Sequence, residues 1–117
     1  MNVKLLVCAA TLAILSAGTA QAKDRYTFFK DVSPILQEKC QDCHRPAGAN
    51  LGGMIAPMSL IRYEEVRPWV KSIVKQIQSR EMPPWDADPR HHGEFRNERT
   101  LSDDQISLIT KWVESGA

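Results

Sequence analysis

Residues 40–44 read Cys40-Gln41-Asp42-Cys43-His44, which places two thiols two residues apart and an imidazole directly after the second thiol. Such a pentapeptide can serve three kinds of chemistry: a redox-active dithiol, one corner of a zinc site, or the covalent attachment of a haem. Each requires a different local structure and different partner residues. The rest of the chain therefore decides among them.

The beginning of the chain has the composition of an export signal. Lys4 precedes an apolar run over residues 5–15, and Ala20-Gln21-Ala22 has the small-x-small pattern of a cleavage site. We therefore expect residues 1–22 to be a signal peptide and residues 23–117 to be the mature domain, located in the periplasm. An apolar run of eleven residues is too short to cross roughly 30 Å of hydrocarbon, so we expect no transmembrane anchor after cleavage.

Cleavage would leave Cys40 and Cys43 as the only thiols, because Cys8 lies within the signal. A secreted domain built on disulfides would carry more cysteines.

Without Lys4, the 15 Lys+Arg fall to 14 and equal the 14 Asp+Glu, so no basic excess indicates a nucleic-acid partner. A domain this small buries a limited fraction of its surface and would gain stability from a large apolar group at its centre.

Hydrophobic periodicity predicts a first helix over residues 27–39 and a second over residues 63–80. Pro34 follows Ser33, a pair that suits a helix start, so the regular part of the first helix is expected to begin there after a turn. Pro68 is compatible with the second helix only near its first turn. The two apolar stripes consist of Phe28, Phe29, Val32, Ile35 and Leu36, and of Val66, Val70, Ile73, Val74 and Ile77.

The last helix is predicted to begin at Ser102, because Gln105 three positions later completes a capping box, and to stop at Gly116. Glycine and proline indicate loops over residues 45–59 and 81–101. No segment alternates with a period of two, so we expect an all-α domain. The apolar side of the last helix would consist of Ile106, Ile109, Trp112 and Val113.

The position of the pentapeptide after a helix argues against a redox dithiol, whose first cysteine needs the start of a helix that follows a strand. A zinc site needs four ligands, and the nearest additional nitrogen donors are His91 and His92 in a distant loop. Haem attachment uses all three residues, because each thiol adds to one vinyl group and the following imidazole ligates the iron. We therefore expect one haem c, bound covalently through Cys40 and Cys43, with His44 as an axial ligand.

The chain resembles the class I cytochrome c family, and within it the small bacterial monohaem domains with a Met-Pro-Pro-Trp distal loop. The motifs that carry the resemblance are residues 40–44, Ala-Pro-Met-Ser-Leu at 56–60 and Met-Pro-Pro-Trp at 82–85, in an order of helices that spans residues 26–117. The resemblance implies a class I cytochrome c-like fold, with about three helices wrapped around the haem. It also implies that the first and last helices cross, with Val32 and Leu36 against Ile109 and Trp112. The chain lacks the glycine and the aromatic residue that better-known members carry at this crossing.

The sixth iron ligand would decide what the haem can do. Met82 follows the predicted middle helix and is held by two prolines, so a whole helix separates it from His44. The resemblance also implies a ligand in this setting, and Met82 is therefore the expected one. The alternatives that stay open are an empty position and the side chains of Met54, Met58, His91 and His92.

The resemblance implies that the carbonyl of Pro57 accepts the remaining N–H of the proximal imidazole, which would put Met58 on the wrong side of the porphyrin. Arg62 or Arg67 are candidate partners of the haem propionates. Candidate walls of the haem pocket are Leu60, Tyr63, Trp69, Val70, Val74, Trp85 and Phe95.

The sequence thus predicts an exported monohaem c-type cytochrome, a monomer that transfers single electrons between other redox proteins. No nucleophile–base pair and no paired carboxylates are placed by spacing, so we do not expect an enzyme. Two alternatives stay open. One is a haem protein that binds or senses a small ligand at a weak or absent sixth position. The other is a stably bound subunit through which electrons enter a periplasmic oxidoreductase.

Overall fold

The computed structural model describes residues 25–46 and 56–117. These residues contain helices and no strand, which confirms the all-α class. The predicted signal peptide, Cys8 and Met54 lie outside the described residues. In chain order the elements are the π-helical turn η2 (Phe28–Val32), α1 (Ser33–Lys39), α2 (Tyr63–Val66), the 3-10 turn η4 (Arg67–Trp69), α3 (Val70–Gln78), the 3-10 turn η5 (Pro89–His91) and α4 (Asp103–Glu114).

The first helical segment has a wider turn at its start than a regular α-helix. Asp31 closes this turn, because its carboxylate accepts hydrogen bonds from the Thr27 backbone N–H at 2.6 Å and from the Thr27 hydroxyl at 3.1 Å. The α-helical part begins at Ser33 with Pro34 in its first turn, as the sequence predicted. It ends at Lys39, directly before the pentapeptide.

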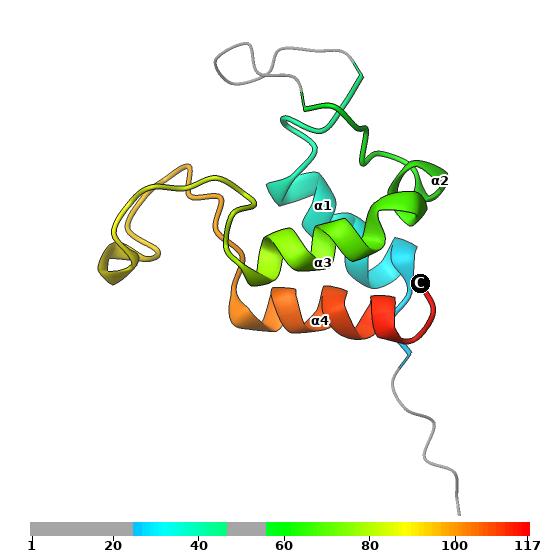
Figure 1. Cartoon of the computed structure of the whole chain (residues 1–117). Coiled ribbons are helices and arrows are strands. Elements are labelled where there is room, and N and C mark those ends of the chain that lie inside the picture. Colours follow the sequence, from blue (N-terminus) through cyan, green and yellow to red (C-terminus); the bar gives the residue numbers. More distant parts are fainter. Residues whose placement is uncertain (1–24, 47–55) are drawn as a thin grey trace, which may run out of the picture.

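The prediction of one continuous helix over residues 63–80 is wrong. Pro68 has no N–H to donate, so the chain passes through η4 between α2 and α3 (Figure 1). The helix also ends at Gln78, two residues earlier than predicted. Arg80 follows with φ of 62°, a left-handed conformation that turns the chain away from the axis of α3.

Helix α4 begins where the sequence predicted. The Ser102 hydroxyl accepts the Gln105 N–H at 3.2 Å, and the Gln105 side chain accepts the Ser102 N–H at 3.0 Å. The helix ends at Glu114, and Gly116 takes a left-handed conformation with φ of 109°. The capping box and the terminal glycine therefore set both ends of α4.

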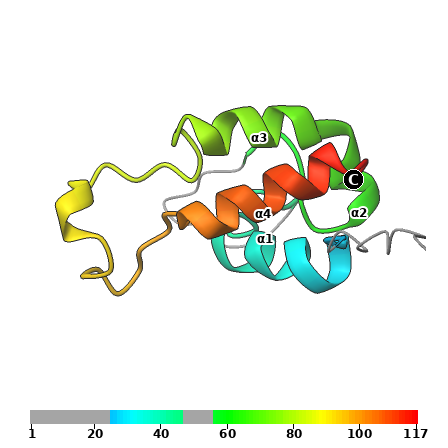
Figure 2. The same cartoon turned by 90° about the horizontal axis from the view of Figure 1, so that it is seen from below.

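The core lies where α4 packs against α3 on one side and η2 on the other (Figure 2). Val32, Leu36 and Ile109 are each about 1% exposed and Trp112 is 4% exposed, all in one buried cluster. The ring of Phe28 contacts those of Tyr63 and Trp112, at centroid distances of 5.3 and 5.8 Å. Burial of aliphatic side chains of this size stabilises the fold by about 1.5–3 kcal/mol each.

Between α3 and α4 the chain leaves the helices and extends away from them, with η5 at its far end (Figure 1). We call residues 79–102 the distal segment. It carries Met82 and both loop histidines. Among the described residues, no helix has the length and apolar character needed to span a bilayer.

Candidate functional site

The pentapeptide forms a tight turn at the C-terminal end of α1. The Cys40 N–H continues the helix by donating to the Leu36 carbonyl at 2.9 Å, and the N–H groups of Cys43 and His44 both donate to the Cys40 carbonyl, at 3.2 and 3.0 Å. The two thiols are free and partly buried. One turn of backbone therefore presents both thiols and the imidazole.

A cavity of about 250 Å³ adjoins this turn. It brings together residues that are far apart in the sequence, since Met82 lies beyond α3 and lines the same cavity as His44. All five residues predicted to hold the cofactor, including Pro57, are among its lining. Among the described residues, the lining consists of Lys39, Cys40, Cys43, His44, Ala56, Pro57, Ile77, Met82, Pro83, Pro84 and Arg99.

The imidazole of His44 is held by a different carbonyl from the one expected. Its Nδ1 lies 3.2 Å from the carbonyl oxygen of Met58, which corrects the prediction of Pro57 by one residue. The register is set on either side, because Ala56 N–H donates to the Cys43 carbonyl and Leu60 N–H donates to the His44 carbonyl, both at 3.0 Å. With Nδ1 donating to Met58, the Nε2 atom is the nitrogen left to bind a metal.

The side chain of Met58 packs against the buried apolar cluster and is not part of the cavity lining. Met82 is 41% exposed, and its N–H donates to the Gln76 carbonyl at 3.2 Å at the end of α3. Of these two methionines, Met82 lines the cavity and Met58 does not.

The two thiols have different surroundings. Burial, with a smaller contribution from the nearby Cys43, raises the pKa of Cys40 to about 11, so this thiol stays protonated at neutral pH. Cys43 instead contacts a cation, because Nη1 of Arg99 donates to its Sγ at 3.5 Å. Sequence reasoning missed Arg99, since nothing local marks an arginine that lies 56 positions away from its partner.

A second cavity of about 320 Å³ shares Ile77, Met82 and Pro83 with the first. His92 and Trp85 of the distal segment also line it. Met82 therefore belongs to the lining of both cavities.

The loop histidines do not line the cavity that holds His44. His91 Nδ1 pairs with Glu94 Oε2 at 2.9 Å, whereas His92 Nδ1 pairs with Glu98 and lies 3.1 Å from the Thr100 hydroxyl. Across residues 25–46 and 56–117, no group of three or more His, Cys, Asp or Glu side chains is arranged to hold a metal ion.

The aromatic and aliphatic residues predicted as pocket walls have other positions. None of the seven lines the cavity at the pentapeptide. Trp69 and Phe95 are 43% and 44% exposed, and Trp85 lines the second cavity, with its ring 5.7 Å from that of Phe95. The remaining four pack in or against the core, and they are Leu60, Tyr63, Val70 and Val74. Spacing identified apolar side chains but not which surface they bury.

The candidate propionate partners also lie elsewhere. Arg62 pairs with Glu65 at 3.2 Å on the surface, and neither Arg62 nor Arg67 lines the cavity. Of the described cations, Lys39 and Arg99 line it, and their side chains are 16% and 19% exposed.

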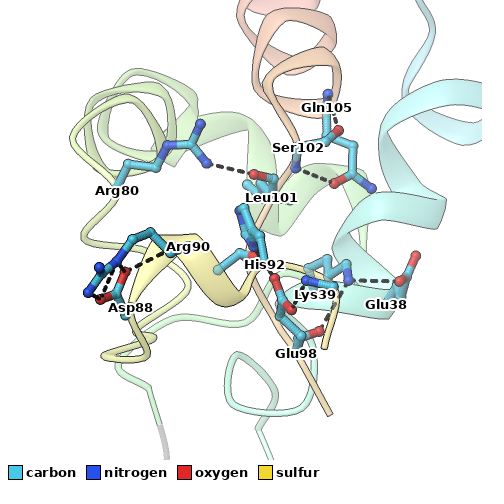
Figure 3. A network of polar contacts seen from close by, with 12 residues as sticks. Glu38, Lys39, Arg80, Asp88, Arg90, His92, Glu98, Leu101, Ser102 and Gln105 are labelled. Carbon is cyan, nitrogen blue, oxygen red and sulfur yellow. Dashed lines mark hydrogen bonds and ion pairs between the residues drawn. The ribbon is translucent and has the colours of Figure 1, made fainter. Parts of the chain in front are cut away.

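Polar contacts close the distal segment at its base (Figure 3). Arg80 donates to the Leu101 carbonyl at 2.7 Å and pairs with Asp103, which joins the end of α3 to the start of α4. Lys39 donates to the Glu98 carbonyl at 3.3 Å, which joins the segment to α1.

The Glu98 carboxylate holds together the part of the distal segment that returns toward α4. It accepts hydrogen bonds from the Thr100 hydroxyl at 2.5 Å and from the Gly93 N–H at 2.6 Å, and it pairs with His92. The Thr100 hydroxyl, followed by the Gly93 N–H and His92, lowers the pKa of Glu98, although partial burial opposes this. The segment that carries Met82 is therefore tied to both α1 and α4.

Comparison of the chain with family models, with curated proteins and with solved structures gave no match.

Proposed function

We propose that this chain is an exported c-type cytochrome that carries one haem on Cys40 and Cys43 and transfers single electrons between redox proteins. The observation that supports it most is the shared cavity, which Cys40, Cys43, His44 and Met82 line together. Met82 comes to this cavity from the far side of α3 in the sequence, so its proximity to the pentapeptide is a property of the fold.

The residues of the cavity fit a c-type haem by their chemistry. Two thiols are available for thioether bonds, an imidazole has its Nδ1 engaged and its Nε2 free for iron, and the Met82 thioether could supply a second ligand. Ligand sites typically measure about 300–1,000 Å³. The cavity at the pentapeptide, about 250 Å³, is smaller than this by itself, but it adjoins the second cavity of about 320 Å³, with which it shares Ile77, Met82 and Pro83.

When bound, the haem would supply the one-electron chemistry of its iron. The chain's own part is to hold and tune that group. The Met58 carbonyl fixes the ring and tautomer of His44, and a methionine sulfur as a second iron ligand would favour reduced iron. Ile77 and the prolines after Met82 give the site apolar walls, whereas the 41% exposure of Met82 leaves this side of the site close to the surface. A partner protein could exchange electrons there.

The test is to produce the full chain in a host competent in cytochrome maturation. We expect mature protein with the mass of one added haem and the pyridine haemochrome of a haem bound through two thioethers. Replacement of both Cys40 and Cys43 by alanine should abolish the attachment, whereas Cys8→Ser, which changes only the predicted signal, should retain it. Colourless wild-type protein with the mass of the bare polypeptide would refute the proposal.

A second candidate function is the binding of a small ligand at the iron. It is favoured by the second cavity beside Met82 and by the exposure of that side chain. Carbon monoxide distinguishes the two functions. An electron carrier should bind it only after Met82→Ala, whereas a ligand-binding protein should bind it as wild type.

A further inference from the structure

We propose, on the basis of the function proposed above, that Arg99 is a positioning residue of the attachment site. Its guanidinium orients the Cys43 sulfur for thioether formation, and together with Asp42 it sets the charge beside the haem.

The guanidinium of Arg99 bridges two adjacent residues of the pentapeptide. Nη1 donates to Cys43 Sγ at 3.5 Å and Nη2 donates to Asp42 Oδ2 at 3.4 Å. The planar, rigid fork of an arginine fixes the relative position of two acceptors, which a lysine ammonium on a flexible stem does not. Arg99 therefore restrains the direction of the Cys43 side chain.

Arg99 is held in place by its neighbours along the chain. The preceding residue, Glu98, receives Lys39 on its carbonyl at 3.3 Å, and Leu101 is 2% exposed in the core. The Arg99 side chain is 19% exposed, compared with 49–85% for Arg62, Arg80 and Arg90, which also pair with carboxylates. Its contact is thus more fixed than an ordinary surface ion pair.

The orientation of Cys43 bears directly on the attachment step. A carbon–sulfur bond forms between Sγ and one vinyl carbon, the thiol S–H bond breaks, and its hydrogen is transferred to the other vinyl carbon. The addition is balanced without an oxidant or a reductant. It requires the sulfur to face the vinyl group, and Arg99 contacts this sulfur within the cavity lining.

The charge of Arg99 has a second effect, because a cation beside the iron favours the reduced state and an anion favours the oxidised state. Asp42 carries the opposite charge, but its side chain is 56% exposed and therefore more strongly screened. Removal of either charge should shift the midpoint potential, in opposite directions, with the larger shift from Arg99.

The experiment compares full-length wild type, Arg99→Gln, Arg99→Lys, Asp42→Asn and the control Arg62→Gln, all produced in a host competent in cytochrome maturation. Arg62 pairs with Glu65 at 3.2 Å as Arg99 pairs with Asp42, but it lies outside the cavity lining. The first readout is the fraction of chains that carry two thioethers, from peptide mass and the pyridine haemochrome. The second readout is the midpoint potential of the doubly attached fraction.

We expect Arg99→Gln to increase the fraction attached through Cys40 alone. At a fixed poise it should also lower the ratio of reduced to oxidised protein by roughly tenfold, which is about 59 mV for a one-electron couple. Arg99→Lys should keep the potential near that of wild type without restoring the double attachment. Asp42→Asn should raise the potential, and Arg62→Gln should change neither readout.

Two results would overturn the role of Arg99. One is an Arg99→Gln variant with the attachment and the potential of Arg62→Gln. The other is a shift of potential in the same direction for Arg99→Gln and Asp42→Asn, because general loosening of the site has no dependence on the sign of the charge. Wild-type protein without haem would instead refute the proposed function itself.

Discussion

The helices and the distal segment are held together by different forces. The helices share an apolar core in which Ile109 is 1% exposed, whereas Met82 and Phe95 of the distal segment are 41% and 44% exposed. Apart from Leu101, which is 2% exposed in the core, the distal segment is closed mainly by polar contacts of Arg80, Lys39 and Glu98. The comparison suggests that stability resides in the helices, while the position of Met82 depends on a few polar contacts that can be removed without unfolding the chain.

The largest expected effect separates the two regions by stability. Ile109→Ala removes a fully buried side chain and should lower the free energy of unfolding by about 2–5 kcal/mol. Phe95→Ala should cost no more than about 0.5–1.5 kcal/mol, since it mainly removes an edge-to-face contact with Trp85. Urea unfolding followed by circular dichroism measures both. Equal losses would show that the distal segment is part of the core.

A smaller effect is expected at the boundary between the regions. Ser102→Ala deletes the hydroxyl that accepts the Gln105 N–H at 3.2 Å at the start of α4. Loss of such a cap costs roughly 1 kcal/mol, measurable in the same urea experiment. Ser107→Ala, within the same helix and without this capping role, serves as the control. If Ser102→Ala leaves the free energy of unfolding unchanged, the distal segment does not depend on the capped end of α4.

Arg80→Gln tests the closure of the distal segment itself. It removes the charged donor to the Leu101 carbonyl and the partner of Asp103. Because both side chains are largely exposed, we expect a loss of no more than about 1 kcal/mol in unfolding free energy. Chymotrypsin should nevertheless cleave faster at Trp85 and Phe95. Arg90→Gln, which breaks a pair inside the segment, should leave this rate nearer to that of wild type.

The smallest effect concerns acid. The pKa of Glu98 is lowered in the folded state from its ordinary 4.5, so its contribution to stability is present above that value and is lost as the pH falls through the lower folded pKa. Glu98→Gln should therefore flatten the dependence of the melting temperature on pH below about 4.5. Glu94→Gln is the control, because Glu94 is 63% exposed and pairs with His91 on the surface. An unchanged slope in Glu98→Gln would remove Glu98 from the closure.

The helices could be predicted from the sequence because their signals are local. The capping box at Ser102 and the proline after Ser33 mark α4 and α1 correctly. The second helix was predicted too long because periodicity continues through Pro68, although the proline interrupts the backbone hydrogen bonds there. The left-handed conformation of Arg80 carried no signal, since glycine is the usual residue for such a turn.

The candidate site was predictable where a local motif marks its residues, namely the pentapeptide and the Met-Pro-Pro-Trp sequence that carries Met82. The pentapeptide marks three of its members, and its register against residues 56–60 was predicted to within one residue, with Met58 in place of Pro57. Arg99 and the surroundings of the aromatic residues depend on tertiary contacts between distant segments. Composition and residue spacing do not predict such contacts.

The left-handed backbone of Arg80 has a consequence for how this molecule is probed. An L-residue in that conformation costs about 1–2 kcal/mol that glycine avoids, while the guanidinium returns up to about 1 kcal/mol through Leu101 and Asp103. Arg80→Gly would ease the backbone and release the cross-link in one step, so the two changes would oppose each other in a melting curve. A thermal screen would score that variant as no less stable than wild type even though the tether of Met82 had been cut.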